Sequence, residues 1–534
     1  MRQQMKRFGW GGPRAVRALV LGSSLGAMSA CDGLLEADLP HVLTDAALES
    51  QASAETQVSS AIALFECGVS TFGWTALGHE GVFESIAGVA GTAHVYRTTP
   101  TTGDCDTTGS SQAWFDQIMG ARALLSTDPN RLNPTGQGTA RGVYDRMQDE
   151  WDLGIPGERL SAIAAIYMAA SLDHFGEFTC EGALDESEMM TPTDFLDLAE
   201  TWVDLAIGTH IPAAGGDFAM PNGIATSAVD MAVALRARIR WANGDLAGAA
   251  ADAAAIPDDF TAWVTRESGE TRRNKIHSAA GFSGMLGLND WWLQSPRNPN
   301  PATSQQWADP IPFSGYLFLG IDATTGRALD ANNVPIRWAE EFRALGDPPT
   351  PLGNGAVEDT RVPHEKQSIQ GPAPREVPAK YSADDDDMPL ISWRELRLIR
   401  AEWENTTNND QAAAIAHVNA LRTAAGLPLI QGAYETDLLG DQDATRAMIL
   451  EERKREFFAE GGRYWSTKIQ NTDLLWFPRA QGSTPEAGYA LLGGVRLQFP
   501  NDEYELNPNF EALGGLAARG TGCTSLPGAQ APII

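Results

Sequence analysis

Residues 227–255 carry the clearest local fold signal of the chain, a pair of helices joined by a tight turn. The first half has apolar residues at helical spacing up to the turn Asn243-Gly244-Asp245, and the second half is mostly alanine. Gly244 can adopt the left-handed conformation that ends a helix, and Asp245 can cap the next helix. Because alanine side chains are small, the two helices can approach closely. The segment therefore predicts a tetratricopeptide-like helical hairpin.

The hairpin pattern recurs later in the chain, although without a fixed repeat length. A second unit is expected from Ser392 to Gly426, where Gly426 and Pro428 end the helix. Single helices are expected in three more ranges, 55–72, 158–172 and 193–207. Thr193 or Asp194 is the expected N-cap of the last one. The pattern as a whole indicates a mainly α protein built on a tetratricopeptide-like scaffold.

Residues 270–390 interrupt this helical pattern. Gly, Pro, Asn and Asp become frequent there, and helical periodicity fades. A loop region this long inside a compact protein is usually functional or disordered, and its many aromatic residues argue against disorder. We therefore expect one domain at residues 58–534, in which helical parts at 58–269 and 391–534 flank a large, irregular, loop-rich insertion.

The first thirty residues have the composition of a secretory signal. They contain five cations and no acid, and the apolar stretch Ala18–Ala30 is followed directly by Cys31. That stretch is shorter than the roughly 18 to 20 residues that a bilayer-spanning helix needs. Small residues directly before a cysteine are typical of a bacterial lipobox, and the alternative is an ordinary signal peptide with an unrelated cysteine. We expect residues 1–30 to be removed, Cys31 to be lipidated, and residues 31–57 to form a tether.

The mature chain is strongly acidic. Without residues 1–30, which carry five cations and no acid, the formal net charge changes from -30 to -35. Such a surface repels nucleic acid and anionic lipid. We therefore expect no nucleic-acid partner.

The cysteines beyond Cys31 indicate disulfides and not a metal site. They are four, Cys67, Cys105, Cys180 and Cys523, and none stands at C-x-x-C spacing. In an exported protein four cysteines can form two disulfides, and three pairings are open. We favour Cys67 with Cys105, which closes a short loop and leaves Cys180 with Cys523.

Motifs for catalysis, metals or cofactors are weak. Residues 22–26 match the G-x-S-x-G pattern, but they lie inside the expected signal peptide. His79 and Glu80 begin an H-E-x-x-H pattern, yet Phe83 occupies the position of the second ligand. The run Asp384–Asp387 lacks the alternating ligands and the glycine of a calcium loop, and we interpret it as a solvated acidic loop. We expect no catalytic residue, no metal and no cofactor.

Three later segments carry a resemblance to a known family. Residues 380–402 combine an incoming strand with a helix that bears repeated acid–apolar pairs, residues 416–428 read AHVNALRTAAGLP, and residues 449–465 read ILEERKREFFAEGGRYW. In this order and spacing they resemble the SusD/RagB family of outer-membrane lipoproteins. One departure is that Ser466 and Thr467 stand where an Asp-Leu pair is common in the family.

The third segment places three acids on one helix face. Glu452, Glu456 and Glu460 follow one another at i,i+4 spacing and would repel one another on an exposed helix. They therefore need cationic partners, and the same motif offers Arg453, Arg455 and Arg463. We interpret the acids as part of a charge network that fixes a helix end, and not as a catalytic carboxylate pair.

Residues 287–316 have the composition of a sugar-binding surface, because aromatics alternate there with Asn, Asp, Gln and Ser. Aromatic faces cover the apolar faces of sugar rings, while amides and carboxylates bond their hydroxyls. The candidate ligand-binding residues are Trp291, Trp292, Trp307 and Tyr316. The resemblance adds the loop after the first helix, with Trp74, His79 and Phe83. The alternative for any one of these aromatics is that it anchors a loop to the core.

The resemblance implies a non-enzymatic protein that binds a nutrient, an oligosaccharide above all, and delivers it to a SusC-type TonB-dependent receptor. It also implies a lipid anchor in the outer membrane. Asp32 after the cysteine disfavours outer-membrane sorting under one bacterial rule, but acidic residues there accompany surface export in organisms rich in this family, and we favour the cell surface. Two other functions stay open. One is a secreted glycoside hydrolase, which needs a carboxylate pair. The other is a helical-repeat adaptor that binds a protein.

Overall fold

The computed structural model describes most of the chain in several stretches. They are residues 49–79, 83–85, 113–127, 141–269, 272–282, 286–288, 321–327, 356–367, 375–471, 496–497 and 499–518. The chain divides into two units, Met1–Ser50 and Gln51–Ile534, and all elements named below belong to the second. Helical structure begins at Gln51, ahead of the expected boundary at residue 58. None of the helices in the described stretches is long and apolar enough to cross a membrane.

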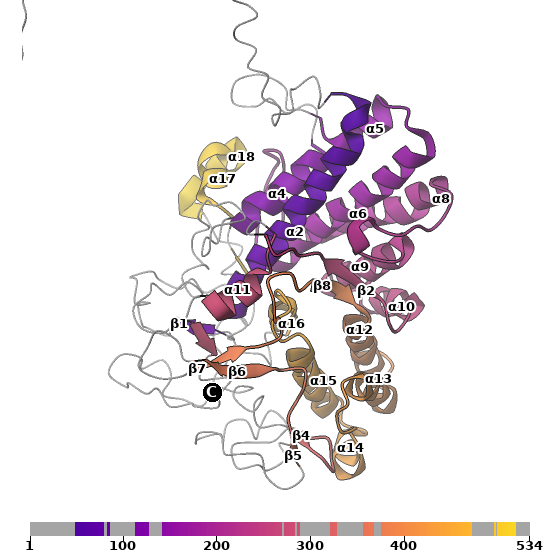
Figure 1. Cartoon of the computed structure of the whole chain (residues 1–534), viewed down its shortest axis with the longest axis vertical. Helices are drawn as coiled ribbons and strands as arrows, with labels where there is room; N and C mark the ends of the chain where they lie inside the picture. The colour runs from indigo at the N-terminus through magenta and orange to yellow at the C-terminus, as the bar shows by residue number, and fades with distance from the viewer. Residues whose placement is uncertain are drawn as a thin grey trace, which may run out of the picture. The chain divides into compact units, whose positions relative to one another are not determined.

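Helices dominate the first part of the second unit (Figure 1). Helix α2 (Ala54–His79) packs along α4 (Ala113–Leu125), and α6 (Gly154–Phe178) packs along α7 (Pro192–Leu205). Shorter elements complete this part: η2 (Gln51–Ser53), α5 (Val143–Asp149), the π-helical segment η3 (Ala206–His210), α8 (Ile211–Ala213) and η4 (Pro221–Gly223). The expected helices at 55–72, 158–172 and 193–207 are all present, with shifted ends.

Helix α2 runs beyond the end expected at residue 72. A Cβ atom at Gly73, the next residue, would lie 2.9 Å from the Ile276 side chain. The glycine therefore allows a close approach between two elements, and the helix continues with Ala76 and Leu77 fully buried. As a result Trp74 lies within α2 and not in a loop after it, which corrects the expectation for this residue.

Helix α7 begins with a complete capping box. The Thr191 side chain accepts a hydrogen bond from the Asp194 N–H, and the Asp194 carboxylate accepts one from the Thr191 N–H at 2.7 Å. Pro192 occupies the first helical position, where no N–H donor is needed. The N-cap is therefore Thr191, and the expectation of Thr193 or Asp194 was wrong.

The two predicted hairpins are confirmed. Helices α9 (Ala228–Ala242) and α10 (Leu246–Ala255) meet at Gly244, which has φ +89°, and the Asp245 carboxylate accepts the Gly248 N–H at 2.9 Å. The second pair is α12 (Trp393–Thr406) and α13 (Gln411–Ala424), followed by Gly426 with φ +68°. Three further helices follow: α14 (Gly432–Leu438), α15 (Gln442–Glu456) and α16 (Arg463–Gln470).

Successive hairpins stack on one another. Helix α7 packs on α9, α10 on α12, and α13 on α15. Each pair therefore buries the face that the pair before it leaves open, as in tetratricopeptide proteins. The mainly α, tetratricopeptide-like scaffold expected from the sequence is confirmed.

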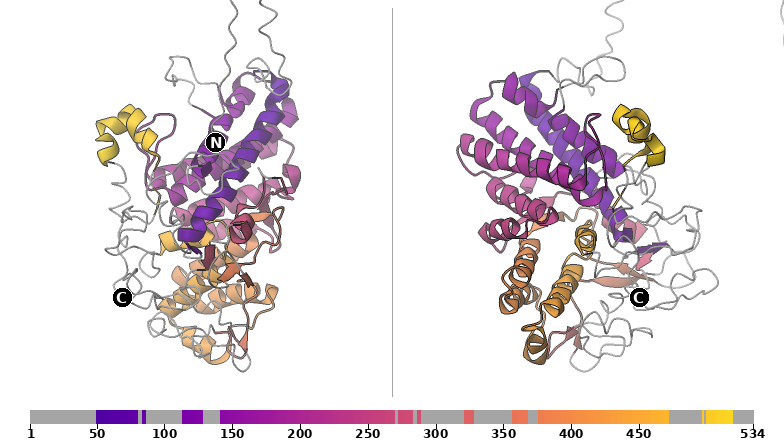
Figure 2. Two further views of the ribbon diagram at one scale, coloured as in Figure 1. Left: turned by 60° about the vertical axis from the view of Figure 1, so that its left-hand side comes forward. Right: turned by 180° about the vertical axis from the view of Figure 1, so that it is seen from behind.

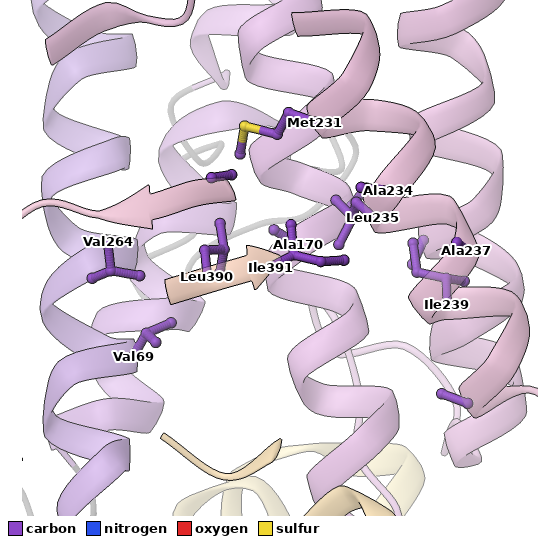
Figure 3. Close-up of a cluster of buried hydrophobic side chains, with 14 of the residues drawn as sticks. Val69, Ala170, Met231, Ala234, Leu235, Ala237, Ile239, Val264, Leu390 and Ile391 are labelled. Atoms are coloured by element: carbon purple, nitrogen blue, oxygen red, sulfur yellow. The ribbon is translucent and has the colours of Figure 1, made fainter. Parts of the chain in front are cut away.

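A short antiparallel ladder crosses the centre of the scaffold. It joins β2 (Thr261–Val264) to β8 (Met388–Ser392), with a bulge between Ala262 and Trp263. Figure 3 shows Val264, Leu390 and Ile391 of this ladder among apolar side chains of α2, α6 and α9. Because β2 precedes the loop-rich insertion and β8 follows it, the ladder holds both ends of the insertion at one place.

The described stretches of the insertion contain short strands and one helix. They are α11 (Lys275–Phe282), β3 (Leu286–Leu288), β4 (Ile321–Asp322), β5 (Ala356–Val357), β6 (His364–Gln367) and β7 (Arg375–Pro378). The ladders β4–β5 and β6–β7 are antiparallel, and β3 pairs with β1 (Phe83–Ser85). The insertion is thus tied together locally by pairs of strands.

The last described elements return to the N-terminal helices. They are α17 (Asn501–Leu506), α18 (Pro508–Ala512) and η8 (Gly515–Ala518), drawn in yellow beside the purple helices in Figures 1 and 2. Leu497 forms a parallel bridge to Thr179, and the Asn507 side-chain amide donates to the Ser187 carbonyl at 3.1 Å. Residues 496–518 therefore pack on the part expected at 58–269, although they fall within the range expected at 391–534.

Candidate functional site

Two segments expected to bind ligand meet in a β-ladder. Strands β1 and β3 pair antiparallel, with Phe83 opposite Leu288 and Ser85 opposite Leu286. Strand β1 follows α2, and β3 ends three residues before Trp291, so the start of the aromatic-rich stretch lies beside the segment after the first helix. Strand β3 also contacts β7 and α11. We call β1, β3, β7 and α11 together the insertion face (Figure 1).

The candidate aromatics themselves lie largely beyond what the structure describes. Trp291, Trp292, Trp307 and Tyr316 lie outside the described residues. The backbone of Trp74 belongs to α2, but its side chain is also outside the description. Their role in binding therefore stays a prediction, while the ladder fixes where the chain leaves the scaffold toward them.

Asn274 fixes the start of α11, which leads from the scaffold to the insertion face. Its side-chain oxygen accepts the N–H groups of Ile276 at 3.0 Å and His277 at 3.1 Å, which makes it an N-cap. Its own N–H and its side-chain amide donate to the carbonyls of Asp384 at 2.6 Å and Asp386 at 2.9 Å. With 0% of Asn274 exposed, these bonds are protected from water and hold α11 to the segment before β8.

The acidic run Asp384–Asp387 is bound to its surroundings more than expected. The Asp384 carboxylate lies 2.8 Å from His277 Nδ1, and the Asp386 carboxylate accepts N–H groups of its own loop. Burial raises the pKa of both carboxyls, but these hydrogen bonds outweigh it and lower each pKa below its ordinary value. Asp385 and Asp387 are exposed, as in the solvated acidic loop predicted from the sequence, while Asp384 and Asp386 are partly exposed and hydrogen-bonded.

Glu66 of α2 binds the segment between β2 and α11. The side chain is 1% exposed and accepts hydrogen bonds from Thr265 Oγ1 at 2.9 Å, Arg272 at 3.0 Å and Arg266 at 3.4 Å. Burial outweighs these partners and raises the pKa of Glu66. The first helix and the start of the insertion are therefore joined by buried polar bonds as well as by the β1–β3 ladder.

The three acids of the C-terminal motif lie in a buried ion network. Glu452, Glu456 and Glu460 are 1%, 2% and 4% exposed. Arg361 donates to Glu452 at 2.7 Å and to Glu456 at 3.2 Å. Each carboxylate is thus removed from water and held by cations, as a structural role requires.

The remaining cations come from the other two segments that carry the resemblance. Arg422 of the second segment donates to Glu452, with its Nε at 3.0 Å. Arg394 of the first segment bridges Glu456 at 3.0 Å and Glu460 at 2.8 Å, and Lys380 binds Glu460 at 2.6 Å. The three segments that are distant in sequence therefore meet in one set of ion pairs.

The expected partners of these acids were wrong. Arg453 binds Glu402 and lies 4.6 Å from the centre of the Trp241 ring. Arg455 binds Glu451 and Asp359, and Arg463 binds Glu177. On a helix the arginines at neighbouring positions point away from the acid face, so the cations must come from other elements.

Asp359 and Arg361 were missed by the sequence reasoning. They lie in the insertion and bond each other at 2.8 Å, while Arg361 reaches Glu452 across 91 residues of sequence. Asp359 also accepts from Arg455 at 3.1 Å. No local pattern marks such a pair, and only the unbalanced acids of α15 signalled that distant cations were required.

Ser466 replaces the common acid with a smaller partner. Its Oγ donates to Glu177 Oε1 at 2.8 Å, and Arg463 donates to both oxygens of the same carboxylate, at 3.1 and 2.5 Å. Thr467 bonds the Arg463 carbonyl at 3.0 Å. Both side chains that depart from the family pattern are therefore hydrogen-bonded.

Acid should weaken the protein through this network. Burial raises the pKa of Asp359, Glu452 and Glu395, but neighbouring arginines outweigh it and lower all three. The unfolded chain then binds more protons than the folded one, so the stabilisation is complete above the ordinary carboxyl pKa of about 4 and is lost as pH falls below it. Denaturant unfolding should show that the free energy of unfolding falls more steeply with decreasing pH for the wild type than for Glu452→Gln, which has no carboxyl group to titrate at residue 452. An equal pH dependence of unfolding in the two proteins would mean that protonation of Glu452 does not weaken the fold.

The described cysteines agree with disulfide formation. Cys67 and Cys180 are buried and disulfide-bonded. Cys105 and Cys523 lie outside the described residues, as does Cys31, so the favoured pairing and the lipidation stay predictions. Within the described stretches, no group of three or more His, Cys, Asp or Glu side chains is placed to hold a metal ion.

Comparison with known proteins places these features in a family. The model of the SusD family matches residues 354–468, which contain the ion network. The SusD-like protein P38 of Formosa agariphila is 35% identical over 167 residues, and the match spans 31% of this chain and only 29% of that protein.

Two solved structures share the fold at low sequence identity. A SusD superfamily protein of Bacteroides vulgatus has a TM-score of 0.51 at 12% identity, over 86% of this chain and 97% of that one. A SusD/RagB family protein of Bacteroides thetaiotaomicron has a TM-score of 0.51 at 12% identity, over 88% and 99%. The matched segment, which holds the ion network, and the helical scaffold therefore both resemble the SusD/RagB family.

Proposed function

We propose that this protein is a cell-surface lipoprotein that captures an oligosaccharide and delivers it to a SusC-type TonB-dependent transporter of the outer membrane. It performs no covalent chemistry on the ligand. The proposal rests on the similarity to the SusD/RagB family together with one structural observation, the β1–β3 ladder.

The ladder supports binding at the insertion face. It brings the segment after α2 beside the start of residues 287–316, where aromatics alternate with amides and acids. The N-cap Asn274 and the buried Glu66 hold this origin rigidly against the scaffold. A fixed origin limits the conformational entropy that the aromatic stretch loses when a ligand binds.

The chemistry of the stretch suits a neutral sugar chain better than an anion. Aromatic rings offer apolar faces to pyranose C–H groups, and Asn, Gln, Asp and Ser bond hydroxyls in either direction. The strong negative charge of the chain disfavours acidic ligands.

Truncation of the candidate platform should weaken binding more than folding. Trp291→Ala and Trp292→Ala should each reduce the binding free energy for the best glycan by about 1 to 3 kcal/mol, as when an aromatic anchor is removed from an interface. A panel of glycans and peptides first identifies the best ligand of the mature protein. Isothermal titration calorimetry then measures the binding free energy of each variant. Thermal unfolding should change little.

Trp114→Ala is the matched control for a core tryptophan. Trp114 is 1% exposed in α4, and its truncation should cost about 3 to 5 kcal/mol of folding stability. If both insertion variants bind normally and unfold early, the platform lies elsewhere, with Trp74 and Trp307 as the next candidates.

Incubation with the best ligand should release no product, and hydrolysis that depends on one carboxylate would show an enzyme instead. A peptide as the best ligand would favour an adaptor.

Loss of the lipid should release the protein from the membrane without unfolding it. We expect Cys31→Ala to leave the thermal unfolding of the expressed chain unchanged and to move it out of the outer-membrane fraction, because lipid chains and not a protein segment provide the anchor. Fractionation followed by immunoblotting measures this. Unchanged outer-membrane fractionation of the variant would contradict lipidation at Cys31.

A further inference from the structure

A polar hollow lies at the junction of the scaffold with the C-terminal motif. It is lined by residues of α2, α6, α9, β8 and the turn before α16. Its apolar wall includes Val69, Ala170, Leu235 and Leu390, which Figure 3 shows around the β2–β8 ladder. Its polar wall consists of Asp173, His174, Arg238, Glu460 and Arg463.

Two adjacent side chains of this wall have polar atoms without partners in the described part of the chain. Asp173 is 3% exposed and His174 is 5% exposed. Among the described residues, neither Asp173 Oδ1 nor His174 Nε2 has a hydrogen-bond partner, although both atoms are buried. The His174 ring packs edge-on against Phe72, with ring centres 4.3 Å apart, so the imidazole is held in place. A buried polar atom without a partner is costly, and native proteins usually supply one.

The charged neighbours cannot supply it, because they are already paired. Arg238 donates to Glu395 at 2.8 and 2.5 Å, and Arg463 donates to Glu177 at 3.1 and 2.5 Å. Glu460 accepts from Lys380 and Arg394. Around Asp173, the carboxylates of Glu177 and Glu395 thus balance the charge of the two arginines.

A further charge on Asp173 would be uncompensated. Burial, and then the nearby Glu177 carboxylate, raise the pKa of Asp173 well above its ordinary value despite Arg238 and Arg463. Burial, with the same two arginines, lowers the pKa of His174 well below its ordinary value. Both shifts favour the neutral forms of the two side chains, a carboxylic acid and an uncharged imidazole.

We propose that the hollow is a binding site for ordered water, held between the side chains of Asp173 and His174. Water can both donate and accept, so it matches a carboxylic acid and an imidazole whatever the tautomer of the ring. A metal cation would need ionised oxygen ligands, and the two guanidinium groups of the wall would repel it. The water site is independent of what the protein transports.

A crystal structure of the mature chain that resolves ordered solvent tests the occupant. We expect a water within hydrogen-bond distance of Asp173 and His174. A direct Asp173–His174 hydrogen bond with no water between them would overturn the proposal. So would a cation, which a rubidium soak would reveal by its anomalous density at this position.

Infrared difference spectra test the protonation of Asp173. At neutral pH the wild type should show the C=O stretch of a carboxylic acid that is missing from Asp173→Asn, because the amide has the same shape and no acid proton. If that variant does not fold, wild-type protein labelled with ¹³C-aspartate serves, since the label shifts the band of a protonated aspartic acid. Absence of any such band in the wild type, or a band that the label does not move, would overturn the neutral acid.

Discussion

Replacing Glu452 with alanine should lower the free energy of unfolding by about 3 to 5 kcal/mol, the usual cost of removing one partner from a buried ion pair. The side chain is 1% exposed and accepts hydrogen bonds from both Arg361 and Arg422. Its removal leaves two buried guanidinium groups short of a counter-charge. Denaturant unfolding of the mature protein, followed by circular dichroism, measures the change.

An ion pair with an exposed carboxylate provides the control for this variant. Asp437 is 53% exposed and lies 4.0 Å from Arg327, so Asp437→Ala should cost at most about 1 kcal/mol. Glu452→Gln keeps the shape but loses the charge, and it should fall between the two. A loss for Glu452→Ala no larger than that for Asp437→Ala would mean that the network does not stabilise the fold.

Gly462→Ala should cost about 2 to 4 kcal/mol, the sum of backbone strain and overpacking. Gly462 has φ +106°, a conformation that side-chain-bearing residues rarely adopt. A Cβ atom there would lie 2.8 Å from Phe72 and 3.1 Å from Phe178. Both rings also pack against Trp465, so they have little freedom to move away.

Two other glycines separate the cost of backbone strain from the cost of overpacking. Gly440 has φ +83°, and a Cβ atom there would have no heavy atom of the described residues within 4 Å, so Gly440→Ala should cost only the strain of about 1 to 2 kcal/mol. Gly208 has neither constraint, and Gly208→Ala should be neutral or slightly stabilising. If Gly462→Ala costs no more than Gly440→Ala in thermal unfolding, contact with the aromatic rings does not constrain the motif.

The hairpins could be predicted because their signals are local. The helix-ending Gly244 and the capping Asp245 stand next to each other in sequence, and the helical spacing of apolar residues needs only one turn of context. Helix ends were predicted less well for a related reason. The first helix was expected to end at residue 72, but it continues through Gly73, which packs closely against Ile276.

The sequence predicted that a buried charge network exists, but not which cations form it. The spacing of Glu452, Glu456 and Glu460 correctly required buried cations, yet the sequence favoured the neighbouring arginines. Arg361 and Arg394 come from elements far along the chain, and long-range pairing has no periodic signature. The meeting of β1 with β3 likewise depends on backbone pairing between segments some two hundred residues apart.

The β2–β8 ladder has a consequence for how ligand specificity can change. Because Val264 lies opposite Met388, the chain leaves the scaffold and returns to it at the same point. The entropy of closing a loop grows only slowly with its length, so the stretch between these strands can lengthen, shorten or be exchanged at small cost to the scaffold. Asp359, Arg361 and Lys380 are exceptions, since they complete the ion network from within that stretch. An insertion from a relative that keeps these residues could therefore bring a new ligand preference to an unchanged helical frame.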